Sequence, residues 1–71
     1  MVEVNGNLVT MTASNEKMIG FLWFAGSNYE AVPFETGTRH AVKSNVPAGT
    51  YIVKEYDSEG NVYDAAEVVV E

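Results

Sequence analysis

The chain of 71 residues carries ten Asp and Glu against four Lys and Arg, for a net charge of −6, and it has no cysteine. The negative charge argues against a nucleic-acid partner, whose phosphates are neutralised by Lys and Arg, and against adsorption to anionic membranes. The absence of cysteine excludes disulfides and thiolate metal sites, two common ways to stabilise so small a domain. This favours association with other protein subunits, so we expect one domain over residues 1–71 whose partners are proteins.

Export and membrane signals are absent from the sequence. Met1 is followed by Val2, Glu3 and Val4, which form neither a basic segment nor an apolar one, so no signal peptide is predicted. The longest apolar run is far shorter than the ~20 residues of a membrane span. We expect either a complete protein made in the cytosol or a domain of a longer secreted protein.

Turn residues divide the chain at intervals of about eight to twelve residues, the spacing of an all-β sandwich or barrel. No stretch keeps the apolar spacing of a helix over three turns. Strands are predicted at residues 2–5, 8–13, 18–25, 30–34, 39–45, 50–57 and 62–70. The expected fold is therefore a small antiparallel sandwich of about seven strands, with a small β-barrel as the alternative.

The first two predicted strands are joined by Asn5-Gly6, a strong signal for a short hairpin. In the second strand, Val9, Met11 and Ala13 share one face. Pro33 places the fourth strand at a sheet edge, because proline cannot donate a hydrogen bond to a neighbouring strand.

The third predicted strand is apolar on both faces, although strands of a two-layer fold usually alternate. One row consists of Met18, Gly20, Leu22 and Phe24, and the other of Ile19, Phe21 and Trp23. A sandwich covers only one face of a sheet by itself. We expect another chain to cover either Ile19-Phe21-Trp23 or Leu22-Phe24, the alternative being that segment 26–38 folds back over the row.

Charge and hydrophobicity are uneven along the second half of the chain. A basic cluster of Arg39, His40 and Lys43 precedes six acids between residues 55 and 71, with no Lys or Arg among them. This distribution suits either ordinary solubility or head-to-tail pairing between subunits. In the last strand the expected inward residues are Val62, Ala66, Val68 and Val70, with Asp64 interrupting the row.

The segment from Val46 to Val53, which contains Pro47-Ala48-Gly49-Thr50-Tyr51, resembles a stretch of immunoglobulin-like bacterial modules. These include fibronectin type III-like domains, collagen-adhesin B-type domains and adhesin repeats of gliding bacteria. The turn at residues 57–61 extends the likeness. The resemblance implies a tyrosine corner, with the Tyr51 ring in the core and its hydroxyl bonded to backbone upstream, and a core role for Trp23. Glu55 departs from the pattern, because it falls where such modules place an inward apolar residue.

No catalytic, cofactor-binding or metal-binding residues are predicted, and we expect no enzyme. His40 is the only histidine, and Glu55, Asp57 and Glu59 surround a hairpin without an evident pocket. Residues 57–61 echo a calcium loop only loosely, and carbohydrate stacking on Trp23 or Tyr29 is a further alternative. The structural and interface residues we expect are Ile19, Phe21, Leu22, Trp23, Phe24 and Tyr51.

These features favour a structural assembly protein, such as a decoration (cement) protein or other component of a bacteriophage virion. Virions assemble in the host cytoplasm, where no signal peptide is needed. The alternative is a binding module of a bacterial surface adhesin or secreted enzyme.

Overall fold

The protein is described over residues 1–71 by a computed structural model, which shows seven strands and no helix. The strands are β1 (Val2–Asn5), β2 (Leu8–Thr12), β3 (Met18–Ala25), β4 (Asn28–Pro33), β5 (His40–Lys43), β6 (Gly49–Asp57) and β7 (Val62–Val70). All seven predicted strands are present. β4 begins two residues earlier than predicted, because Gly26 and Ser27 alone form the turn after β3. The chain forms no helix that could cross a membrane.

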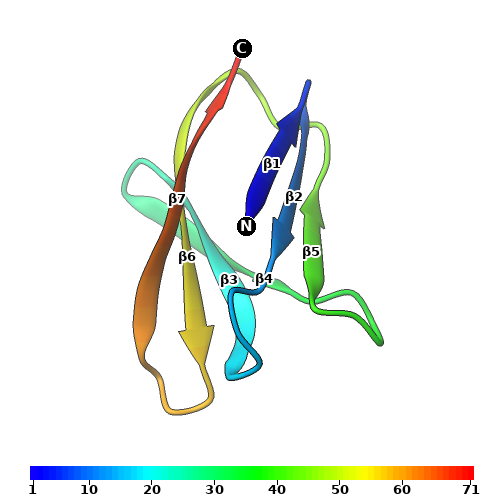
Figure 1. The fold of residues 1–71 in the computed structure, drawn as a ribbon. Coiled ribbons are helices and arrows are strands. Elements are labelled where there is room, and N and C mark those ends of the chain that lie inside the picture. The colour runs from blue at the N-terminus through cyan, green and yellow to red at the C-terminus, as the bar shows by residue number, and fades with distance from the viewer.

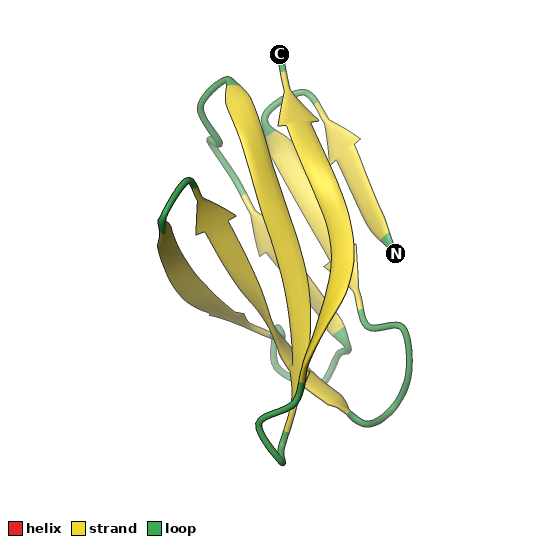
Figure 2. Ribbon diagram, turned by 90° about the vertical axis from the view of Figure 1, so that its left-hand side faces the viewer, coloured by secondary structure: helices red, strands yellow, loops and turns green.

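The strands form two antiparallel sheets that lie face to face (Figures 1 and 2). We call the three-stranded sheet, with order β1-β2-β5, sheet A, and the four-stranded sheet, with order β4-β3-β6-β7, sheet B. The sheets remain separate, so the fold is an all-β sandwich rather than one closed barrel. β4 lies at an edge of sheet B, as its proline predicts.

Two tight turns join neighbouring strands where the sequence places glycine. Gly6 (φ 63°) opens the Gly6-Asn7 turn between β1 and β2, and Gly26 (φ 65°) opens the Gly26-Ser27 turn between β3 and β4. A positive φ at the first turn residue alone is the pattern of a type II′ hairpin, which matches the twist of the strands. The predicted hairpin at Asn5-Gly6 is confirmed.

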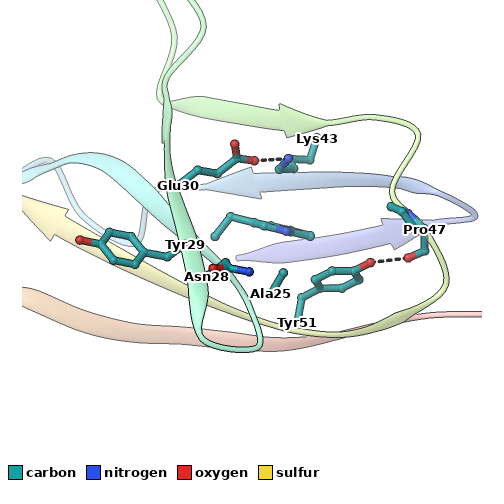
Figure 3. A pocket seen from close by; sticks show the side chains of 8 residues that line it. Ala25, Asn28, Tyr29, Glu30, Lys43, Pro47 and Tyr51 are labelled. Carbon is teal, nitrogen blue, oxygen red and sulfur yellow. Dashed lines mark hydrogen bonds and ion pairs between the residues drawn. The ribbon is translucent and has the colours of Figure 1, made fainter.

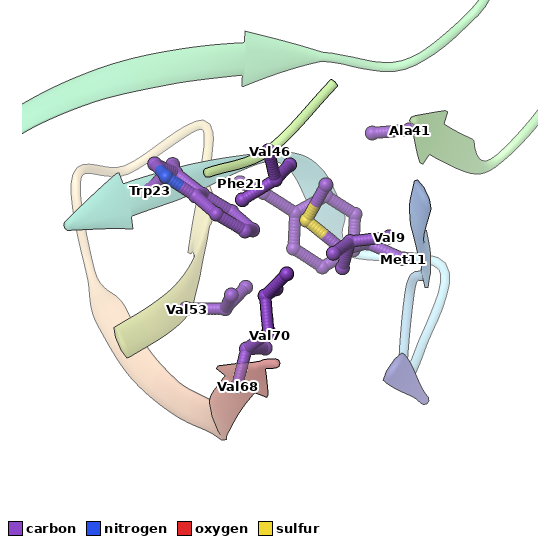
Figure 4. Packing of buried hydrophobic residues seen from close by; sticks show 9 residues of the cluster. All are labelled: Val9, Met11, Phe21, Trp23, Ala41, Val46, Val53, Val68 and Val70. Atoms are coloured by element: carbon purple, nitrogen blue, oxygen red, sulfur yellow. The ribbon is translucent and has the colours of Figure 1, made fainter. Parts of the chain in front are cut away.

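The core lies between the two sheets, where the inward side chains of both meet (Figure 4). Its nine buried residues are Val9, Met11, Phe21, Trp23, Ala41, Val46, Val53, Val68 and Val70. Phe21 is completely buried, and burial of such a side chain contributes about 1.5–3 kcal/mol to stability. Of the three residues predicted to share one face of the second strand, Val9 and Met11 are completely buried, and Ala13 is half-buried just beyond the end of β2.

A β-bulge corrects the prediction for the third strand. The register between β3 and β6 shifts between Met18 and Gly20, so the alternation of faces is interrupted there. Met18 is buried, whereas Ile19 is 47% exposed and does not join the row of Phe21 and Trp23. Extra residues of this kind change which face the following side chains occupy.

The inner row of β3 is covered by the protein itself. Phe21 and Trp23 pack in the core between the sheets, so of the two rows that another chain was expected to cover, Ile19-Phe21-Trp23 is excluded and Leu22-Phe24 remains. The alternative, that segment 26–38 covers the row, holds only in part. Val32 and Phe34 pack against the core, but β4 pairs with β3 and extends the sheet sideways.

A second bulge corrects the prediction for the last strand. The register of β6 with β7 shifts between Val53 and Lys54, where Ala65 has no partner. Ala66, Val68 and Val70 lie on the inner side as predicted, but Val62 is 50% exposed, so its predicted inward position is wrong. Asp64 pairs with the outward Lys54 and therefore does not interrupt the inner row.

Candidate functional site

The hydrogen bond expected of a tyrosine corner at the start of β6 is present, but the Tyr51 ring packs against the core from its edge and is not fully buried. The Tyr51 hydroxyl donates a hydrogen bond of 2.6 Å to the Pro47 carbonyl, four residues upstream. The half-buried Tyr51 ring packs against the buried Trp23 ring, with 4.9 Å between centroids. The hydrogen bond and the packing together fix the orientation of Tyr51.

Beside this corner, an open groove of about 340 Å³ lies where edge strand β4 of sheet B faces edge strand β5 of sheet A. Its lining residues are Trp23, Ala25, Asn28, Tyr29, Glu30, Lys43, Pro47 and Tyr51. Figure 3 shows the Asn28 and Glu30 side chains on the groove side of β4, and the Tyr29 ring on the opposite side. The groove therefore combines aromatic and polar side chains.

An ion pair between Lys43 and Glu30 bridges the two sheets at this groove (Figure 3). The Lys43 ammonium also lies 5.5 Å from the centroid of the Trp23 ring, a distance typical of a cation–π contact. The Asn28 side chain makes no hydrogen bond within the protein and is exposed. One acid, one base and one free amide thus give the groove polar groups without net charge.

The outer face of sheet B carries the second apolar row of β3. Leu22 and Phe24 are half-buried there. The Phe24 ring stacks on Tyr29 with 5.2 Å between centroids, and the Lys54 ammonium lies 5.5 Å from its centroid on the same face. Further apolar side chains of this outer face are Ile52, Tyr56, Val62 and Val69.

The outer face of sheet A is different, because it is mostly polar. Its residues include Glu3, Thr10, Thr12, His40 and Val42. An apolar outer face is therefore a property of sheet B, and not of the sandwich as a whole.

Gly20 lies on the outer face of sheet B, in the middle of β3, and its surroundings show why a glycine is needed there. A Cβ atom at Gly20 would lie 2.6 Å from the Tyr56 hydroxyl oxygen, closer than non-bonded atoms approach. The Tyr56 ring lies across the space that the missing side chain leaves. The glycine thus lets the aromatic surface continue from β6 onto β3.

The basic cluster is engaged within its own chain. The Arg39 guanidinium donates to the carbonyls of Asn15 (2.7 Å) and Met18 (2.6 Å) and lies 5.2 Å from the Phe34 ring centroid. Lys43 pairs with Glu30. Arg39 and Lys43 therefore already have partners within the chain, which weakens the alternative of head-to-tail charge pairing.

His40 has a partner that the sequence did not indicate. Its Nδ1 lies 3.1 Å from the Thr12 hydroxyl oxygen, because β2 and β5 bring these two residues opposite each other. Only the register of β2 with β5, which the sequence does not reveal, could have predicted the contact between Thr12 and His40.

The acids of β6 hold loops of the protein. Glu55 is buried, and its carboxylate accepts hydrogen bonds from the Ser14 backbone N–H (2.8 Å) and the Ser14 hydroxyl (2.7 Å). Glu55 can therefore occupy a position where immunoglobulin-like modules place an apolar residue, because the two hydrogen bonds from Ser14 compensate for burying its carboxylate.

Asp57 organises the turn that resembled a calcium loop. Its carboxylate accepts hydrogen bonds from the backbone N–H of Glu59 (2.9 Å) and Asn61 (3.0 Å), the Asn61 side chain (3.2 Å) and the Tyr63 hydroxyl (3.3 Å). Burial raises the pKa of Asp57, but these hydrogen bonds, those from Asn61 foremost, lower it by more, so the pKa lies below 3.8. No three His, Asp or Glu side chains gather as a metal site.

Comparison with protein-family models, with characterised proteins and with solved structures finds no match to this chain. The resemblance to immunoglobulin-like modules therefore rests on this protein's own residues and geometry.

Proposed function

We propose that this protein is a non-enzymatic assembly protein that binds neighbouring protein subunits through the outer face of sheet B. The observation that carries the proposal is the outward row of Leu22 and Phe24, which faces away from sheet A and is only half-buried, by outer-face neighbours such as Tyr29 and Lys54. Ile52 (38% exposed) and Val69 (55% exposed) widen the apolar area on the same face. A cluster of this kind on one face only is typical of a protein-binding surface.

The charges on this face favour a different protein as the partner over a second copy. The outward acids Asp64 and Glu67 lie on β7, and the only cation of the face, Lys54, already pairs with Asp64 at 3.4 Å. A second copy would bring no free positive charge to the acids and would leave them unpaired or opposed. The partner we propose presents apolar side chains flanked by Lys or Arg.

The setting we propose is a bacteriophage particle, in which the protein decorates the capsid after synthesis in the host cytoplasm. The sheet orders and the Tyr51 hydrogen bond support the likeness to immunoglobulin-like modules. Because that architecture serves many functions, the assembly role depends on the outer face of sheet B and not on the fold.

Co-sedimentation with capsids tests this proposal. The isolated chain should sediment as a monomer and should pellet with capsids of the phage whose genome encodes it. Phe24→Glu should abolish pelleting, because it replaces the apolar ring at the centre of the contact with a charge that must be desolvated there. Val42→Glu is the matched control, since Val42 is 37% exposed on the outer face of sheet A. Undiminished binding by Phe24→Glu, or no binding by the unaltered chain, would reject the proposal.

The groove at Trp23 and Tyr51 favours the second function expected from the sequence, a binding module of a bacterial surface adhesin or secreted enzyme. It is a concave site with few polar groups among aromatic ones, which is typical of small-ligand sites.

A further inference from the structure

We infer that the groove between β4 and β5 binds a neutral sugar ring, with Tyr51 as the stacking surface and Asn28, Glu30 and Lys43 as hydrogen-bonding partners. This inference deepens the second function and is independent of the assembly role. The groove and the row of Leu22 and Phe24 lie on opposite faces of sheet B.

The size and place of the groove are the first support. Its volume of about 340 Å³ falls at the lower end of the range of small-molecule sites, which begins at about 300 Å³. It lies where the edge strands of the two sheets face each other without backbone pairing. An opening of this size suits one or two rings of a small ligand better than a long peptide.

The aromatic wall is rigid before any ligand arrives. Trp23 is only 4% exposed and packs against the half-buried Tyr51 ring, with 4.9 Å between centroids, and both line the groove. The hydrogen bond to Pro47 occupies the Tyr51 hydroxyl proton and holds the ring. Tyr51 thus offers a flat apolar surface whose orientation needs no ordering upon binding.

The polar groups of the groove select against charged ligands. Glu30 would repel an anion, Lys43 would repel a cation, and their pairing leaves no net charge. The free Asn28 amide offers two donors and an acceptor, and the ion pair offers further donors and acceptors. A fitting ligand is neutral, has one flat apolar face and carries hydroxyl groups at its rim, which is the chemistry of a pyranose.

The experiment uses Trp23, the only tryptophan of the chain, as a reporter that lines the groove. Tryptophan fluorescence of the full chain is titrated with methyl glucoside, methyl galactoside, methyl mannoside and N-acetylglucosamine. The expected result is a saturable change for at least one of them, with a Kd on the order of 1 mM, since a single ring has few atoms in contact. Sorbitol, which has the hydroxyls but no ring, should give no saturable change.

Variants locate the site. Asn28→Ala should weaken binding about fivefold, the usual effect of losing one hydrogen bond. Asn5→Ala is the matched control, because Asn5 is exposed at the end of β1 in sheet A and should leave binding unchanged. Backbone amide shifts in NMR should fall on β4, β5 and residues 47–51.

Several outcomes of the sugar titrations and of the variants would overturn the inference. They are no saturation with any pyranoside, an equal response to sorbitol, and an effect of Asn5→Ala as large as that of Asn28→Ala. A response to sodium acetate or ammonium alone would also reject it, because it would show a site for ions. Capsid binding by the Asn28→Ala variant remains a separate readout, so failure of the assembly proposal is distinguishable.

Discussion

The two ends of the inward row of β6 hold the sandwich by different means. At the start of the strand, Tyr51 and Val53 pack against Trp23 and the core. At its end, the same row carries the buried carboxylates of Glu55 and Asp57, whose partners are loop N–H and hydroxyl groups. The start of the strand is therefore held by apolar packing, and its end by hydrogen bonds that the carboxylates of Glu55 and Asp57 accept.

The difference shows how a domain without disulfides closes its loops. Apolar packing joins strands that face each other, but it cannot fix the exposed backbone of a turn. A carboxylate accepts several donors at once, and hydrogen bonds to charged groups contribute about 1.5–3 kcal/mol each. We expect the two ends to respond differently to truncation and to pH.

The largest effect is expected at the apolar end. Tyr51→Ala removes the ring packed on Trp23 and the hydrogen bond to Pro47, and should lower the free energy of unfolding by about 3 kcal/mol. Tyr51→Phe keeps the ring and should cost only about 1 kcal/mol. Urea denaturation measures both. A loss below about 1 kcal/mol for Tyr51→Ala would contradict the packing role.

At the polar end, Glu55→Ala should lower the free energy of unfolding by about 2 kcal/mol, because both Ser14 donors lose their acceptor. Glu55→Gln keeps one acceptor oxygen and should lose less. A double-mutant cycle with Ser14→Ala isolates the contact, and we expect a coupling of about 1 kcal/mol. Additive effects of the two substitutions would show that the contact contributes little.

We expect acid to destabilise the fold through protonation of Asp57. The hydrogen bonds lower its pKa in the folded protein below the 3.8 of the unfolded chain. The unfolded state therefore binds the proton more readily, so this contribution is complete above pH 3.8 and is lost as the pH falls through the lower folded value. Unfolding in urea over an acidic pH series should show this loss. Asp57→Asn should make the free energy of unfolding less dependent on pH in this range. If that dependence is unchanged, Asp57 is not its cause.

The smallest effect is expected in alkali. Burial, and then the nearby charge of Asp57, raise the pKa of Tyr63 above 10.0. Its contribution is therefore present below pH 10.0 and is lost as the pH rises through the higher folded value. Tyr63→Phe should remove the alkaline loss and, because it also removes one hydrogen bond to Asp57, should slightly weaken the acid dependence. The absorbance of tyrosinate, followed against pH, measures the pKa directly, and a value at or below 10.0 would contradict the contact.

The number of strands and their positions along the chain could be predicted, because glycine, proline and asparagine mark the turns between apolar stretches; the order of the strands in the two sheets was not predicted. The tyrosine corner could be predicted as well, since Pro47 and Tyr51 lie in one short segment. The faces of Ile19 and Val62 could not, because a bulge reverses the alternation and leaves no local mark in the sequence.

Contacts between distant segments were also beyond the sequence. Ser14 and Glu55 are 41 residues apart, and neither residue indicates the other. The groove could not be predicted either, because Glu30 and Lys43 form their ion pair only when β4 and β5 lie as edge strands on the same side of the sandwich. The sequence predicted two apolar rows on β3, but not that Leu22 and Phe24 would form the outward one.

The bulge at Ala65 also bears on how the protein avoids aggregation. β7 is an edge strand of nine residues, and a straight edge of that length would accept the strand of another molecule and grow into a fibril. The bulge shifts the hydrogen-bonding register between the two halves of that edge. An incoming strand can therefore pair in register with only one half. The remaining edges are short in β1 and β5 and contain Pro33 in β4. Contacts between molecules are thereby directed away from the edges and toward the faces of the sheets.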